Sequence, residues 1–392
     1  MRKSLRLTFA VIVVCFAASS WLAPGAAARV PFGFAGVMID GPMNAPGYDP
    51  APEMDVMVAS GVESVRFAFH WVDSQPYGSL TQIPEAQRPE FADVDGIPTT
   101  FSRFDPMVAA AAARGLTLLP NVTTAPGWAA KQPGVFGSPP KGTASFARFA
   151  RVLVRRYGPA GRFWAENPGL PRRPIRKWQL WNEPNLRYSW TERRWAPGYV
   201  KLLRAGRAAI KDADPGARIV LAGLANVSWA DLDRIYRVPG ARRLFDEVAI
   251  HPYTKPPEGV IAILERVRKT MARYGDRRKP VTVTEFGWPS SKGEVEGIGV
   301  STDRRGQAAR LRKALPLLAR NRKRLHLTSV YYYTWVTNDR PNSSIFFYAG
   351  LRHRLPSGKI VPKPAFHVFR TTALRLEGCR VKASVATRCA RR

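Results

Sequence analysis

The chain has 392 residues, with 61 Lys and Arg against 29 Asp and Glu, a formal net charge of +32 and 11% aromatic residues. This length suits one large domain or two ordinary ones, and the aromatic content supports a sizeable core. The basic residues are scattered through predicted helices and loops, which argues against a nucleic-acid partner and favours a basic exported protein. An acidic glycan or a cell-wall polymer is the alternative partner for this charge.

Residues 1–28 have the pattern of a secretory signal. Three cations lie among the first six residues, residues 7–18 are apolar, and the small residues 26–28 offer a cleavage site before Arg29. The apolar run is short for a membrane span, so we expect cleavage, with an uncleaved anchor as the alternative. Because nothing later in the chain resembles a transmembrane helix, we predict a secreted, extracellular or envelope-associated protein without a membrane span after cleavage.

Three cysteines occur along the chain. Cys15 leaves with the signal, whereas Cys379 and Cys389 are near neighbours in the polar tail of residues 377–392. In an exported protein this spacing predicts a disulfide that closes a small loop. No Cys/His spacing suggests a metal site, and we expect neither a metal nor an organic cofactor.

Eight strand-then-helix units can be followed along residues 29–376. The predicted strands are residues 32–39, 64–69, 117–122, a short strand around Trp178, 218–221, 247–250, 281–284 and 329–333. The predicted helices are residues 51–60, 104–114, 143–157, 199–210, 229–236, 261–271, 304–321 and 364–376. Apolar strands that alternate with amphipathic helices predict a parallel sheet, and eight units are the number that closes a barrel. The predicted fold is therefore α/β, a single (β/α)8 TIM barrel.

Two glutamates end strands of this predicted barrel, where the carboxyl ends of all strands open on one face. Glu183 follows the strand around Trp178, which Pro184 must end, and Glu285 follows the strand at 281–284. Glycosidic cleavage needs two carboxyl groups, one protonated and one ionised, on opposite sides of the bond. Taken alone, Glu183 could be a solvated turn residue and Glu285 a salt-bridge partner, but the pair favours catalysis.

The segments that carry these glutamates resemble a known family. Trp-Asn-Glu-Pro-Asn at 181–185 resembles the strand-four signature of clan A (4/7 superfamily) retaining glycoside hydrolases, and Thr-Glu-Phe-Gly-Trp-Pro at 284–289 resembles their nucleophile segment. The resemblance implies that Glu183 is the general acid/base and Glu285 the nucleophile. It also implies double displacement with retention of configuration.

The resemblance extends to further strand ends. It implies that Asn182 binds the sugar 2-hydroxyl, that Tyr253 of a His-x-Tyr pattern with His251 orients the nucleophile, and that Trp335 forms the floor under the sugar ring. Arg66 resembles an arginine that some members place beside the nucleophile, and a buried arginine needs an acid partner. A core role is the alternative for both His251 and Trp335.

Five weaker candidates follow or end strands, and each could equally be structural. They are Asp40, His70, Asn121, Trp128 and Trp288. We include Asn121 and Trp288 among the predicted substrate-binding residues, because an amide can bind a sugar hydroxyl and an indole can stack on a sugar ring. The other predicted substrate-binding residues are Asn182, His251, Tyr253, Trp335 and Arg66.

The substrate class stays open at this level. The clan resemblance covers cellulase-like, β-1,3-glucanase-like and β-xylosidase-like members, and the long loops could build an open groove for endo action or a closed pocket for exo action. We expect a monomer that acts on a β-linked poly- or oligosaccharide, an anionic one in view of the charge. A barrel without catalytic activity, or a basic envelope protein that binds cell-wall or acidic glycans, is the alternative.

Overall fold

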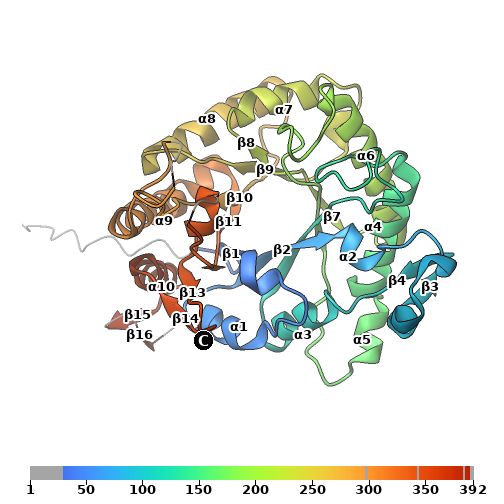
Figure 1. The fold of residues 1–392 in the computed structure, drawn as a ribbon. Coiled ribbons are helices and arrows are strands. Elements are labelled where there is room, and N and C mark those ends of the chain that lie inside the picture. Colours follow the sequence, from blue (N-terminus) through green and yellow to red (C-terminus); the bar gives the residue numbers. More distant parts are fainter. Residues whose placement is uncertain (1–29, 296–298, 342–343, 383–384, 389–392) are drawn as a thin grey trace, which may run out of the picture.

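The computed structural model describes residues 30–295, 299–341 and 344–382, and the backbone of 385–388 (Figure 1). The predicted signal at residues 1–28 and Cys389 lie outside these ranges. Cys379 is disulfide-bonded. Because Cys389 lies outside the described ranges, the predicted pairing of these two cysteines stays a prediction. Within the described ranges, no helix combines the length and apolar character that crossing a bilayer requires.

A curled, parallel, nine-stranded sheet forms the centre of the molecule (Figure 1). Its order is β7-β6-β5-β2-β1-β11-β10-β9-β8. The strands are β1 Ala35–Ile39, β2 Ser64–His70, β5 Thr117–Thr123, β6 Lys177–Leu180, β7 Arg218–Val220, β8 Leu224–Ala225, β9 Val248–His251, β10 Val281–Phe286 and β11 Leu327–Tyr332. Most strand residues are buried on both faces, which explains why these segments are apolar runs without alternation.

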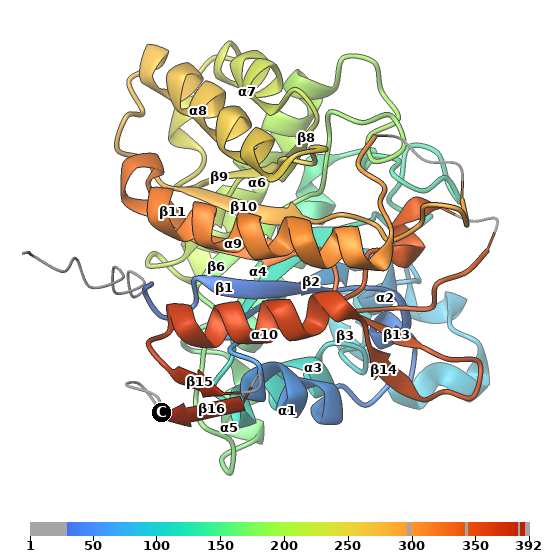
Figure 2. The same ribbon diagram turned by 90° about the vertical axis from the view of Figure 1, so that its left-hand side faces the viewer.

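Helices cover the outside of the sheet, and α8, α9 and α10 lie side by side on one flank (Figure 2). The main helices are α1 Ala51–Ala59, α3 Asp105–Ala113, α4 Thr143–Tyr157, α6 Trp195–Ala213, α7 Ser228–Tyr236, α8 Pro257–Arg273, α9 Arg304–Leu325 and α10 Pro364–Leu376. Each amphipathic helix turns its apolar side to the sheet, as Phe146, Phe149 and Leu153 of α4 show. One large hydrophobic core results between the helices and the sheet.

Shorter elements lie outside the nine-stranded sheet. They are α2 Trp71–Ser74, α5 Arg162–Glu166, the hairpin β3 Ala92–Val94 with β4 Ile97–Thr99, the small sheet β12 Val336–Thr337, β13 Arg352–Arg354 and β14 Ile360–Pro362, and the pair β15 Arg380–Lys382 with β16 Val385–Arg388. The 3-10 turns are η1 Gly41–Asn44, η2 Leu80–Gln82, η3 Glu85–Glu90, η4 Ala241–Arg243 and η5 Ile345–Tyr348. Most of the minor sheets and 3-10 turns fall in the long connections that follow β2 and β11.

The order of the predicted strands and main helices is confirmed, but the structure has one strand more than predicted. The predicted strand at 218–221 is β7, and the unpredicted β8 follows after an interruption at residues 221–223; these two are the outermost strands of the sheet. The interruption includes Gly223, where a Cβ would lie 1.9 Å from Nε2 of His251. The structure thus shows nine strands in a curled sheet, where the sequence predicted eight in a closed barrel.

Candidate active site

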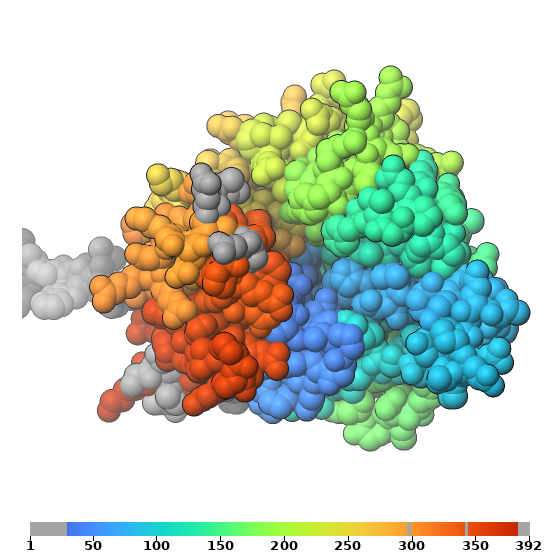
Figure 3. Space-filling view, viewed as in Figure 1, coloured from blue at the N-terminus to red at the C-terminus, as the bar shows by residue number. Residues whose placement is uncertain are grey.

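A cavity of about 630 Å³ opens at the carboxyl ends of the strands, within the usual range for small-molecule sites. Figure 3 shows the molecule hollowed on this face, between loops that come from distant parts of the chain. The lining residues include both predicted catalytic glutamates, as well as Asn121, Asn182 and Tyr253. Far-apart strand ends therefore meet at one cavity, as the barrel interpretation required.

Glu183 reaches this cavity through an unusual stretch of backbone. Trp181 has φ 74° and Glu183 has φ 42°, both in the left-handed region that side chains disfavour. Each such residue costs on the order of 1–3 kcal/mol. The backbone N–H of Trp181 donates to Val122 O (2.8 Å) and that of Glu183 to Gly223 O (3.1 Å), which fixes the turn. The strain is therefore concentrated where the carboxyl group must be presented.

Two side chains hold the Glu183 carboxyl group. His251 Nδ1 lies 2.7 Å from Oε1 and the Tyr188 hydroxyl donates to Oε2, while Nε2 of His251 lies 2.9 Å from Thr284 Oγ1. Burial raises the pKa of Glu183, but the hydrogen bonds from His251 and Tyr188, together with electrostatic attraction from His251 and Arg66, hold this pKa below its ordinary value. His251 is fully buried and does not line the cavity. Its predicted sugar contact is therefore wrong, and it supports Glu183 instead.

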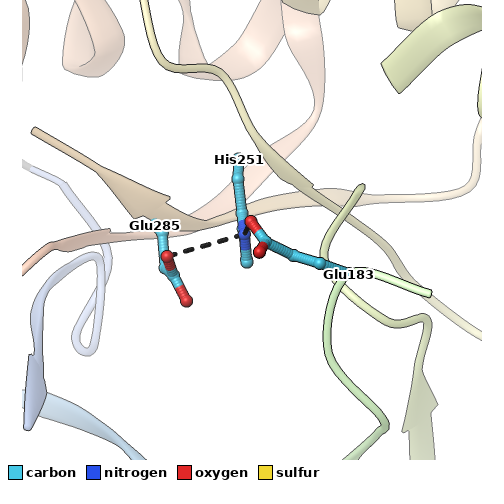
Figure 4. Close-up of side chains that lie close together, drawn as sticks. All are labelled: Glu183, His251 and Glu285. Atoms are coloured by element: carbon cyan, nitrogen blue, oxygen red, sulfur yellow. Dashed lines mark hydrogen bonds and ion pairs between the residues drawn. The ribbon is translucent and has the colours of Figure 1, made fainter. Parts of the chain in front are cut away.

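Glu285 belongs to β10, and its carboxyl group accepts two hydrogen bonds from side chains. Arg66 Nη1 donates to Oε1 at 2.6 Å and the Tyr253 hydroxyl donates to Oε2 at 3.0 Å. Both contacts were predicted and both are present. Figure 4 shows the Glu183 and Glu285 side chains on either side of His251. One carboxyl oxygen of each glutamate and one ring nitrogen of His251 all lie within 4.8 Å of one another.

Arg66 is the hub of a buried network below the cavity. It is fully buried, and beyond Glu285 its Nε donates to Gln179 Oε1 (2.7 Å) and its Nη2 to Asn182 Oδ1 (2.7 Å). Asn121, with its amide oriented to donate to the Trp181 carbonyl, accepts from Nη2 at 3.0 Å. The predicted Asn121 and Asn182 thus line the cavity and are tied to the arginine that contacts Glu285.

Replacing Arg66 by Met should lower the free energy of unfolding by about 3–5 kcal/mol, because Glu285 would be left as an unpaired buried charge. Urea denaturation followed by circular dichroism measures this change. The matched control is Arg114→Met, which breaks the more exposed Arg114–Asp55 pair and should cost about 1 kcal/mol or less. Equal losses in the two variants would contradict the buried-pair account.

Trp335 and Trp288 do not line the cavity, so both predicted substrate contacts are wrong. Trp335 lies past the end of β11, where its N–H donates to Met38 O and its indole donates to Glu53 Oε2 (2.7 Å) in the core. The Trp288 indole donates to Thr254 O (2.6 Å) and is also buried. In both cases the side chain points to the core around the strand end and away from the cavity.

Tyr333 takes the place predicted for Trp335. Its side chain lines the cavity, its hydroxyl donates to Asp40 Oδ2 at 2.6 Å, and its ring meets Phe346 edge-on at 5.7 Å. Of the five weaker candidates, Asp40, His70 and Asn121 line the cavity. Trp128 lies outside the lining and donates to the Gln75 carbonyl.

Sequence reasoning missed Tyr188, Thr284, Gly223, Tyr333 and Phe346. Gly223 lies outside the predicted strand at 218–221, so the sequence pattern gave no signal for its close approach to His251. Tyr188 follows Glu183 within the same polar segment, but nothing in a linear pattern indicates that its ring folds back onto that carboxylate.

Glu183, His251 and Glu285 also have the spacing of a cation site. The surrounding charges oppose that use. Arg66 donates to Glu285 from 2.6 Å, and His251 already shares Nδ1 with Glu183 and Nε2 with Thr284. A cation would have to displace these donors and lie close to a guanidinium, so the arrangement suits paired carboxyl chemistry better than metal binding.

No protein-family model matches the chain, and no curated protein matches it by sequence. Solved structures do match. A monomeric β-xylosidase from Caulobacter crescentus CB15 has a TM-score of 0.60 at 18% identity, over 86% of this chain and 67% of that one. The GH39 enzyme from Xanthomonas axonopodis pv. citri has a TM-score of 0.62 at 19% identity, over 89% and 68%.

A third similar structure is the hyperthermophilic β-glucosidase from Pyrococcus furiosus, with a TM-score of 0.61 at 13% identity, over 89% of this chain and 96% of that one. The chain has the fold of clan A glycoside hydrolases. The fold implied by the resemblance of residues 181–185 and 284–289 is therefore confirmed.

Proposed function

We propose that the chain is a retaining glycoside hydrolase that cleaves β-linked O-glycosidic bonds. One observation carries the proposal: oxygens of Glu183 and Glu285 lie within 4.8 Å of each other in one cavity. Retaining enzymes hold their carboxyl groups about 5–5.5 Å apart, whereas inverting enzymes leave about 6.5–9.5 Å for a water molecule. The short distance between the two glutamate oxygens supports a reaction that retains the configuration at the anomeric carbon.

The reaction follows from this geometry as a double displacement. Glu285 attacks the anomeric carbon while Glu183 donates a proton to the departing oxygen, which leaves a glycosyl ester on Glu285. Glu183 then removes a proton from water, which attacks the same carbon and releases the ester with net retention.

The contacts around Glu285 support its role as the nucleophile. Arg66 and Tyr253 each donate to one oxygen of the Glu285 carboxyl group, and these two hydrogen bonds fix its orientation. Asn182 lies beside both glutamates on the cavity wall, where its amide can reach the sugar 2-hydroxyl. The site is thus organised before substrate arrives.

The proposal includes a closed (β/α)8 barrel, with β7 and β8 as two parts of one strand. Parallel bridges join Val220 to Glu247 and Asn182 to Gly223 across the interruption. Leu119, Val220, Ala249 and Tyr331 from four strands also pack together as one cluster. Both observations support a barrel wall that continues from β7 to β8 across residues 221–223.

The substrate we propose is a β-linked oligo- or polysaccharide outside the cell. The similar structures include a β-xylosidase and a β-glucosidase, which supports β-linked sugars. The signal-like residues 1–28 support export, and we expect a monomer to act.

A panel of aryl β-glycosides and β-linked glycans tests the proposal, with product detection by mass spectrometry. The matched control is the double variant Glu183→Gln/Glu285→Gln, which keeps the shape of the cavity. Hydrolysis by the native chain and not by the control supports the proposal. No hydrolysis of any β-linked substrate would refute it.

A second candidate function is binding of an anionic glycan through α9. This helix contains no acid. Five of its exposed cations share one face by helical spacing and form no ion pair within the described residues: Arg305, Arg312, Lys313, Arg320 and Lys323. So many unpaired like charges on one face fit a polyanion.

Replacing these five α9 cations by Gln should lower the salt concentration that elutes the protein from a carboxylated polysaccharide resin. The control replaces five exposed cations elsewhere by Gln: Arg88, Arg148, Arg193, Lys201 and Lys255. If both variants elute at the same salt concentration, only total charge matters and α9 is no specific binding surface.

A further inference from the structure

Tyr188 lines the cavity and contacts Glu183, but it has no role in the proposed reaction. Its hydroxyl donates to Glu183 Oε2, while Oε1 is held by His251 at 2.7 Å. A general acid must lie within hydrogen-bond reach of the oxygen that it protonates. Tyr188 and Glu183 line the same cavity, so the Tyr188 hydroxyl competes with the leaving-group oxygen for Oε2 of Glu183.

We propose that Tyr188 is a gate on the acid/base: its side chain must leave Glu183 before a glycoside can bind with its leaving group against that carboxyl group. The inference rests on the proposed glycosidase function. It adds a positioning residue that the sequence motifs do not indicate.

The surroundings of Tyr188 allow this movement without unfolding the segment. Its side chain lies at the rim, and the residue is 57% exposed. The backbone on both sides is fixed, because Asn185 donates to Ala225 O (3.0 Å) and Asp231 (2.9 Å), and the Trp181 indole donates to Ser189 O (2.9 Å). Rotation of an exposed side chain is fast compared with turnover. The ring can therefore move while its backbone stays in place.

The displaced ring has a second aromatic residue near it on the rim. Gly137 packs so closely on this segment that a Cβ there would lie 2.0 Å from the Tyr188 carbonyl oxygen. This close approach places the adjacent Phe136, which is 62% exposed, in the same cavity wall. Two rings beside the acid form a surface on which the leaving-group ring can stack. The leaving group that fits is a sugar or aryl ring, in preference to a small alcohol.

Several charged or titratable groups set the protonation of Glu183. Those that interact with it are Arg66, Tyr188, His251, Tyr253, Glu285 and Tyr333. Burial raises the pKa of Glu183, whereas the Tyr188 hydrogen bond stabilises the carboxylate and lowers this pKa. Departure of the Tyr188 hydroxyl removes one of the contacts that lower the pKa of Glu183. The same movement that admits the leaving group therefore removes a hydrogen bond that favours the carboxylate over the protonated acid.

The test is Tyr188→Phe, which keeps the ring and removes the hydroxyl. With a β-linked disaccharide, KM should fall by up to about tenfold, since substrate no longer competes with the hydrogen bond. The basic limb of kcat/KM should move to higher pH, because it reports the acid of the free enzyme, whereas the basic limb of kcat should stay in place. A structural role for the hydroxyl would move both limbs or neither.

The control is Tyr77→Phe, which removes a hydroxyl bonded to Gln87 outside the cavity lining. An activity-independent readout is the ¹³C NMR titration of the Glu183 carboxyl signal in the free protein, assigned with Glu183→Gln. We expect Tyr188→Phe to raise its midpoint and Tyr77→Phe to leave it unchanged. An unmoved midpoint in Tyr188→Phe overturns the gate even if hydrolysis is seen. Absence of hydrolysis in all variants overturns the proposed function instead.

Discussion

Glu285→Ala should lower kcat by about 10⁴-fold or more, because no glycosyl ester can form without the nucleophile. Steady-state kinetics on an aryl β-glycoside measure the loss. Added azide should restore turnover by attacking the anomeric carbon from the vacated side, with an inverted glycosyl azide as the product. The rescue separates loss of the nucleophile from loss of the fold.

The same residue should be the site of covalent labelling. A 2-deoxy-2-fluoro β-glycosyl fluoride slows the second displacement, so the ester should accumulate on Glu285 and be found there by peptide mass spectrometry. Glu285→Gln is the matched control and should remain unlabelled. A label on any other carboxylate would remove Glu285 from the proposed role.

Glu183→Ala should have an effect that depends on the leaving group. Natural β-linked disaccharides need a proton on the departing oxygen, so kcat/KM should fall by about 10²–10⁴-fold, the usual contribution of general acid catalysis. For a dinitrophenyl glycoside the first displacement needs no proton and should keep nearly its native rate. Stopped-flow detection of the phenolate burst measures that step.

The comparison of Glu183→Ala with His251→Ala refines this prediction. His251 contacts Glu183 Oε1 and does not line the cavity, so its loss should affect the same proton transfer by a smaller factor. If Glu183→Ala slowed cleavage of the β-linked disaccharide and of the dinitrophenyl glycoside by the same factor, Glu183 would not be the general acid.

The sequence was sufficient for the placement of Glu183 and Glu285. Buried parallel strands are continuous apolar runs, and their carboxyl ends share one edge of the sheet. A proline after Glu183 and the end of the apolar run before Glu285 fixed both positions in the chain. Their meeting in one cavity then followed from the strand order alone.

Side-chain direction beyond a strand end could not be predicted in this way. Trp335 and Tyr333 are two residues apart in the same segment, yet Tyr333 lines the cavity and Trp335 packs against the core. In the core, the Trp335 indole donates to Glu53, a residue from the opposite end of the chain. Such long-range contacts leave no periodic signal.

The interruption between β7 and β8 has a similar cause. Gly223 must lack a side chain because the ring of His251 occupies that space, and His251 in turn holds Glu183. The three residues are distant in sequence and form one unit only after folding. Local patterns detect the glutamate and cannot detect the residues that support it.

The most direct test of two converging carboxylates is the configuration of the first product. ¹H NMR spectra recorded within seconds of mixing the native chain with a β-glycoside show the anomeric proton before mutarotation. Our account predicts that the β-anomer appears first and the α-anomer only later. Initial release of the α-anomer would mean inversion by a single displacement, and would contradict the role that the geometry assigns to Glu285.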